Sequence, residues 1–297
     1  MDYGSVIYGS ANKHVLRALD PIHHQGLRIA LGAFRTTPIK SLYAEAGEPS
    51  LEHRRMKLAF NYVLKLKSLP RNPCIEVIFE APLSDFSAVN TFEHFKNANI
   101  SLNIIDNLHV QCPPPWEEHK ITVDTSLTKQ NKENTSIQGN ENVEKLAKAA
   151  LNRALCSGKL ICYFDLKPKI NSYINSVWQK DWDAEGANKL HEVLPNLGED
   201  LHRRGDGGGR KQETAMCRLR VGHTWLTQSY LLKNEEQPFC YACDSLYTVR
   251  HILIECPDFQ DTRRKYFSVT DLYILFREVN PSRIAGYLKD VGVYGKI

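Results

Sequence analysis

Four potential metal ligands near the C-terminal end of the sequence constrain its fold more than any other feature. Two residues separate Cys240 from Cys243, seven separate Cys243 from His251, and four separate His251 from Cys256. Three thiolates and one imidazole complete the tetrahedral coordination that zinc prefers and leave no position for water. The spacing therefore predicts a structural zinc site, which stabilises folding and takes no part in catalysis. The alternative interpretation is three buried cysteines beside a core histidine.

The start of the sequence and its eight cysteines indicate an intracellular protein. The chain opens with Met-Asp-Tyr-Gly-Ser and lacks the basic head and apolar run of a secretory signal. We therefore expect reduced cysteines rather than a disulfide framework. No apolar stretch approaches the ~20 residues that span a bilayer. We expect a soluble protein of the nucleus or cytoplasm that is neither secreted nor bound to a membrane, and no small-molecule substrate is evident.

Hydrophobic periodicity predicts a mainly α-helical chain, whose 297 residues suggest about two domains. Asp20 and Pro21 indicate a helix start, with the Asp20 side chain capping the first turn. Apolar residues that include Ile22 and Ile29 follow at helical spacing. A connector helix is expected over 167–184. Its predicted inward residues are Ile170, Tyr173, Ile174, Val177 and Trp178.

A further helix is predicted from Leu51 to Leu69. Its apolar stripe includes Ala59, Val63 and Leu66, and basic residues occupy much of the remaining surface.

Positive charge gathers in the segment before the cysteine cluster. Residues 201–223 hold six basic residues against Asp206 and Glu213, in a chain whose formal net charge is +4. Aromatic residues follow, and positive charge beside aromatic rings favours single-stranded RNA or DNA. The alternative interpretation is a solvated helix face beside a core. The predicted nucleic-acid contacts are Arg203, Arg204, Arg210, Lys211, Arg218, Arg220 and Trp225.

Several long motifs resemble one family, the reverse transcriptases (RNA-directed DNA polymerases) of jockey-like non-LTR retrotransposons. The segments similar to the region after the polymerase palm are Tyr3-Gly4-Ser5, Leu19-Asp20-Pro21-Ile22-His23-His24-Gln25-Gly26-Leu27-Arg28, Gly32-Ala33-Phe34-Arg35-Thr36 and Leu42-Tyr43-Ala44-Glu45-Ala46-Gly47-Glu48-Pro49-Ser50-Leu51. Trp178-Gln179-Lys180-Asp181-Trp182-Asp183 resembles the connector after the family's ribonuclease H domain. Leu219-Arg220-Val221-Gly222-His223-Thr224 and the cysteine cluster resemble its C-terminal zinc-binding region. His223 is then expected to pack near the zinc unit, with a role as a fifth ligand as the alternative.

The sequence departs from this family at both catalytic centres. The family's polymerase carries paired aspartates for two Mg²⁺ ions on a Tyr-Ala-Asp-Asp turn, and the similar Tyr241-Ala242-Cys243-Asp244 places a predicted zinc ligand at the third position. Glu144 stands where the resemblance implies the last ribonuclease H carboxylate. The stretch between Trp116 and Gly139 is too short to hold that domain's sheet at ~5 residues per strand. The resemblance thus implies a truncated chain without polymerase activity and a nearly deleted ribonuclease H domain. It also implies that the apolar stripe of the helix from Leu51 lacks the palm against which it would pack. We therefore expect an exposed apolar surface that destabilises the N-terminal region or makes it self-associate.

Four regions follow from these interpretations. They are a helical post-palm region over 1–112, a polar linker over 113–138, a relic of the last ribonuclease H helix with the connector over 139–210, and a small Cys3His zinc module over 211–297. The first hypothesis is an inactive retrotransposon-derived protein that retains zinc-dependent nucleic-acid binding. The alternatives are a zinc-stabilised protein-interaction module and a divergent ribonuclease H-type nuclease that uses Asp124, Glu141 and Glu144.

Overall fold

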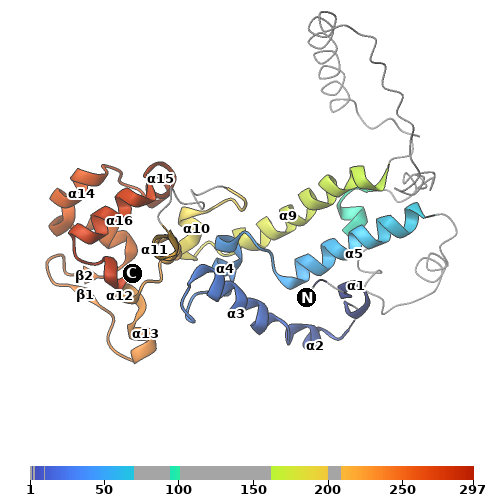
Figure 1. Cartoon of the computed structure of the whole chain (residues 1–297), viewed down its shortest axis with the longest axis horizontal. Helices are drawn as coiled ribbons and strands as arrows, with labels where there is room; N and C mark the ends of the chain where they lie inside the picture. The colour runs from blue at the N-terminus through green and yellow to red at the C-terminus, as the bar shows by residue number, and fades with distance from the viewer. Residues whose placement is uncertain (1, 3, 10, 70–93, 101–161, 200–208) are drawn as a thin grey trace, which may run out of the picture. The chain divides into compact units, whose positions relative to one another are not determined.

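The computed structural model describes residues 2, 4–9, 11–69, 94–100, 162–199 and 209–297 (Figure 1). Helices dominate these residues, and one two-stranded antiparallel sheet is present among them. The mainly α-helical class is therefore confirmed. In the described ranges, no helix is both long enough and apolar enough to cross a bilayer.

The chain forms two compact units that alternate along the sequence. One comprises residues 1–59 together with 170–297, and the other comprises residues 60–169. The expected linker over 113–138 lies outside the described residues. The boundary expected at residue 210 falls inside helix α11, Gly209–Val221. Residues 1–59 and 170–297, which the sequence placed in separate regions, thus belong to the same compact unit.

Five helices lie in the described N-terminal segment. In α3, the face that packs against the core differs from the face that helical spacing indicated. The five are α1 Ser5–Tyr8, α2 Lys13–Arg17, α3 Asp20–Leu31, α4 Ile39–Ala46 and α5 Leu51–Ser68. Helix α3 starts at Asp20 as expected, but Leu19 occupies the N-cap and no side chain caps the turn. Ile22 and Ile29 are more than 60% exposed. The inward face instead carries Leu27, which packs with Leu42 and Tyr43 of α4.

The apolar stripe of α5 is covered, and the expectation of an exposed surface there is wrong. Ala59, Val63 and Leu66 are all buried. In the second unit, Phe60 is also fully buried, and its ring meets that of Phe95 edge to face at 4.5 Å between centroids. Helix α5 ends at Ser68, close to the predicted end at Leu69.

Most of the core of the first unit comes from the C-terminal segment. Its helical elements are α9 Lys167–Asp183, α10 Lys189–Val193, α11 Gly209–Val221, α12 Trp225–Gln228, α13 Tyr230–Lys233, η3 His251–Glu255, η4 Pro257–Phe259, α14 Gln260–Tyr266, α15 Leu272–Glu278, α16 Pro281–Asp290 and η5 Tyr294–Lys296; η2 Tyr163–Leu166 precedes them in the second unit. Ile170 and Ile174 of α9 are buried as predicted. Trp182 is also buried, and its indole N–H donates to the Leu194 carbonyl at 2.8 Å.

The N-terminal segment contributes directly to this core. Ala44 of α4 belongs to the same buried cluster as Leu219 of α11 and Leu253 of η3. Gly32 closes α3 with φ 67°, in the left-handed region that favours glycine. A Cβ at Gly32 would lie 2.6 Å from the Thr214 side chain of α11, so the residue also permits a close approach. The two segments therefore pack as one body.

Candidate metal centre

A short hairpin places the first two cysteines of the cluster. Strand β1, Phe239–Cys240, pairs antiparallel with β2, Ser245–Leu246, so that Cys240 lies opposite Ser245. The backbone N–H of Cys243 donates to the Cys240 carbonyl at 3.3 Å. Asp244 takes φ 52°, which turns the chain sharply back into β2. This turn brings the thiols of Cys240 and Cys243 close to each other.

A wide helical turn places the other two candidate ligands. In η3, the backbone N–H of His251 donates to Thr248 Oγ1 at 3.0 Å. The N–H of Cys256 donates to the His251 carbonyl, five residues back, at 2.8 Å. Cys256 thus ends the helical turn, and Pro257 follows it.

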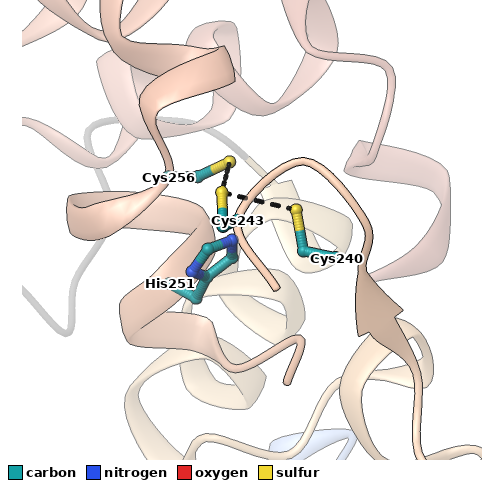
Figure 2. A group of neighbouring side chains, drawn as sticks. All are labelled: Cys240, Cys243, His251 and Cys256. Atoms are coloured by element: carbon teal, nitrogen blue, oxygen red, sulfur yellow. Dashed lines mark hydrogen bonds between the residues drawn. The ribbon is translucent and has the colours of Figure 1, made fainter. Parts of the chain in front are cut away.

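The four ligand atoms lie within 4.8 Å of one another. Figure 2 shows the four side chains pointing toward a common centre. Cys243 Sγ lies 3.6 Å from both Cys240 Sγ and Cys256 Sγ. Tetrahedral zinc with bonds of ~2.3 Å holds sulfurs about 3.8 Å apart, so the spacing is compatible with zinc. Cys240, His251 and Cys256 are buried. The predicted metal-ligand set is therefore brought together in space.

The orientation of His251 suits metal ligation. Its Nδ1 lies 3.3 Å from Ser245 Oγ, whereas its Nε2 is buried and has no hydrogen-bond partner among the described residues. Ligating histidines commonly hold one ring nitrogen in a hydrogen bond and offer the other to the metal. Nε2 is therefore the candidate ligand atom. The backbone of the last candidate ligand is also held in place, because the Arg263 guanidinium donates to the Cys256 carbonyl at 2.9 Å.

The crowded thiols favour a bound cation electrostatically. Burial raises the pKa of Cys243, and the adjacent Cys240 and Cys256 raise it further, to about 12. Burial also acts to raise the pKa of Cys240, but hydrogen bonds from Cys243, Ala242 and Cys256 together outweigh it, and the net shift is downward. Several thiolates therefore cannot coexist here without compensation. A divalent cation would supply that compensation by binding the thiolates directly.

The basic residues before the cluster have roles that the sequence did not reveal. Arg220, a predicted nucleic-acid contact, is buried and forms an ion pair with Glu45. That prediction is wrong, because its guanidinium is enclosed by protein. Arg218 donates to the Gly32 carbonyl at 2.8 Å and to the Ile297 carbonyl at 2.9 Å, and stacks on Phe34. Both arginines therefore tie α11 to neighbouring segments.

The other predicted nucleic-acid contacts differ in their exposure and in their partners within the protein. The guanidinium of Arg210 donates to the Ile29 carbonyl at 2.7 Å, although the residue is exposed. Lys211 is exposed. Trp225 is 41% exposed, with the Lys233 ammonium 5.5 Å from its ring centroid. Arg203 and Arg204 lie outside the described residues, as do Asp124, Glu141 and Glu144.

His223 is not one of the converging ligands. Burial, followed by the charge of Lys189, lowers its pKa to about 4, which keeps the ring neutral at physiological pH. Its Nδ1 is buried and has no partner within the described part of the chain. A fifth-ligand role for this residue therefore gains no support.

Two aromatic residues and one leucine of the hairpin itself are exposed. The Tyr241 side chain, between the two cysteines of the turn, is 93% exposed. Its ring meets that of Phe239 edge to face, with centroids 5.8 Å apart. Leu246 on β2 is 47% exposed. An outward-facing tyrosine on a fixed turn gives a partner a flat surface on which to stack.

Comparisons with protein-family models, curated protein sequences and solved structures each give no match to this chain. Functional interpretation therefore rests on the residues and their geometry.

Sequence spacing identified all four candidate ligands. It missed Ser245, Thr248 and Arg263, which position those ligands, because hydroxyl and guanidinium groups near a cysteine pair carry no distinctive spacing.

Proposed function

We propose that this chain is a retrotransposon-derived reverse transcriptase segment without polymerase activity, whose zinc-stabilised C-terminal part binds single-stranded nucleic acid. The resemblance of its long motifs to jockey-like elements supports the origin. The convergence of Cys240, Cys243, His251 and Cys256 supports the zinc. The 297 residues hold no Tyr-Ala-Asp-Asp turn, so the segment itself does not supply the paired aspartates of the polymerase.

The exposure of Tyr241 is the observation that carries nucleic-acid binding. The Tyr241 ring is 93% exposed, and candidate metal ligands lie on both sides of it in the turn. The backbone that carries the ring therefore has little flexibility to lose when a partner binds. Bases of any sequence stack on such rings, and each stacked base contributes about 1–3 kcal/mol. The mode of binding would therefore be stacking with little sequence preference.

The charges near the hairpin limit where the phosphates lie. Glu235, Glu236 and Asp244 stand close to it in sequence, and Lys233 forms an ion pair with Glu235 at 3.7 Å. These acidic groups repel a phosphate backbone. The hairpin would then hold bases, and the cations that bind phosphates would lie elsewhere on the protein.

We expect the zinc-loaded full chain to bind a fluorescently labelled single-stranded RNA, with affinity falling roughly tenfold or more between about 50 and 200 mM salt. Tyr241→Ala should weaken binding by about 1–3 kcal/mol, whereas Tyr241→Phe, which keeps the ring, should bind like the parent protein. Fluorescence anisotropy titrations measure both effects.

Substituting an exposed aliphatic residue gives the matched control. Ile29→Ala removes apolar surface from a residue that is 67% exposed, without removing a ring, and should leave affinity unchanged. No RNA binding at either salt concentration would reject the proposed function and favour the protein-interaction alternative. Equal affinities for Tyr241→Ala and the parent would show that the hairpin is not the base-binding surface.

A further inference from the structure

Two lysines from different helices converge on a single aromatic ring in the first unit. The Lys211 ammonium, from the start of α11, lies 5.6 Å from the centroid of the Tyr294 ring. The Lys289 ammonium, from the end of α16, lies 5.3 Å from the same centroid. Two positive charges are therefore held near one ring.

Nothing described in the structure neutralises this pair. Neither lysine forms an ion pair with a described residue, and both are exposed. Asp290, the residue after Lys289, accepts a hydrogen bond from the Tyr266 hydroxyl. Glu213 follows Lys211 by two positions on α11, and residues so spaced do not share a helix face. The two ammonium groups are thus available to an anion from outside the chain.

The surrounding contacts fix the position of the pair. Gln212 Nε2 lies 3.2 Å from Ser282 Oγ, which joins the first turn of α11 to the first turn of α16. Ser282 and Lys289 are seven residues apart and so lie on the same face of α16. Lys296, two residues after Tyr294 in the same 3-10 turn, is exposed and is a third cation close to the ring in sequence.

We propose that Lys211, Lys289 and the Tyr294 ring form a phosphate-binding site for the backbone of single-stranded nucleic acid. Each ammonium supplies three N–H donors for phosphate oxygens. The Tyr294 ring positions both side chains by cation–π attraction. The site rests on the proposed function, and it supplies the phosphate contacts that the acidic hairpin lacks. Lys211 belongs to the contacts first predicted, whereas Lys289 and Tyr294 do not. Two of the other predicted contacts, Arg218 and Arg220, are engaged within the protein.

The test compares two double variants of the full, zinc-loaded chain. Lys211→Gln with Lys289→Gln removes the proposed contacts, and Lys40→Gln with Lys180→Gln removes the same charge from exposed positions elsewhere in the unit. The slope of log affinity against log salt is measured for single-stranded RNA by anisotropy. Each phosphate contact contributes about 0.7 to this slope, so the first variant should reduce its magnitude by about 1.4 and the second should leave it near the parent value.

Tyr294 supplies a second measurement. Tyr294→Phe keeps the ring and should keep the parent slope, whereas Tyr294→Leu releases both lysines and should lower affinity without removing charge. Equal slopes for the two lysine double variants would overturn the site. So would equal affinities for Tyr294→Leu and Tyr294→Phe.

A linear inorganic polyphosphate separates failure of the site from failure of the proposed function. Binding of polyphosphate that is lost in Lys211→Gln with Lys289→Gln, but retained in the control double variant, would support the phosphate site even if RNA did not bind. RNA binding that is unaffected by the two lysines would retain the proposed function and reject the site. Failure of both probes to bind the parent chain would reject both.

Discussion

Glu45→Ala should lower the free energy of unfolding of the full chain by about 3–5 kcal/mol. Glu45 is 3% exposed and Arg220 is 7% exposed, and Arg220 Nε lies 3.0 Å and 3.2 Å from the two carboxylate oxygens. Removing Glu45 leaves a buried guanidinium without its counter-charge, and breaking a buried pair in this way is strongly destabilising. Chemical denaturation, followed by circular dichroism, measures the change.

A surface ion pair provides the matched control. Glu192 pairs with Arg250, and both side chains are more than a third exposed, so Glu192→Ala should cost no more than about 1 kcal/mol. Replacing both buried partners, as in Glu45→Met with Arg220→Met, should recover much of the stability, because no buried charge remains. A Glu45→Ala effect as small as that of Glu192→Ala would mean that Arg220 reaches solvent.

The Arg220 pair also shows what the sequence could not reveal. Glu45 lies 175 residues before Arg220, and no local pattern joins the two. A cluster of arginines before a group of cysteines has the composition of a nucleic-acid surface. Only the tertiary contacts show which guanidinium groups are engaged within the protein. The apolar spacing that grouped Ile22 with Ile29 was misleading for a related reason, since both side chains are exposed. Helical spacing identifies residues on one face of a helix but does not show which face packs against the core.

The features predicted correctly depend on local geometry. A cysteine pair separated by two residues closes through its own turn, and the end of a helical turn places Cys256 next to His251 within one short segment. Strong periodicity likewise located α5 and α9, because their buried residues recur within a few turns. By contrast, the assembly of residues 1–59 with 170–297 depends on contacts across more than a hundred residues, which a single sequence does not encode in any local pattern.

Cys256→Ser should abolish stoichiometric zinc binding and unfold the hairpin that carries Tyr241. Strands β1 and β2 contain two residues each, and a hairpin of that size is not stable in water without further support. Structural zinc contributes about 10–16 kcal/mol in small zinc modules, which is comparable to the whole net stability of a domain. Zinc content by elemental analysis and hydrogen exchange at the Cys243 amide measure the two effects. Cys162→Ser, at a cysteine outside the cluster, should change neither.

Zinc affinity should also fall as the pH falls, because protons compete with the metal for the thiolates. The crowded environment holds the pKa of the metal-free Cys243 thiol near 12, so this thiol is protonated at neutral pH and must release its proton when zinc binds. Calorimetry in buffers of different ionisation enthalpy counts the released protons.

A chelator should have the same effect as Cys256→Ser on hydrogen exchange in residues 239–256, while amides of α5 remain protected. Uniform loss of protection throughout the chain would instead show that the metal supports the shared core as well as the hairpin, and RNA binding would then be lost together with global stability rather than through Tyr241 alone.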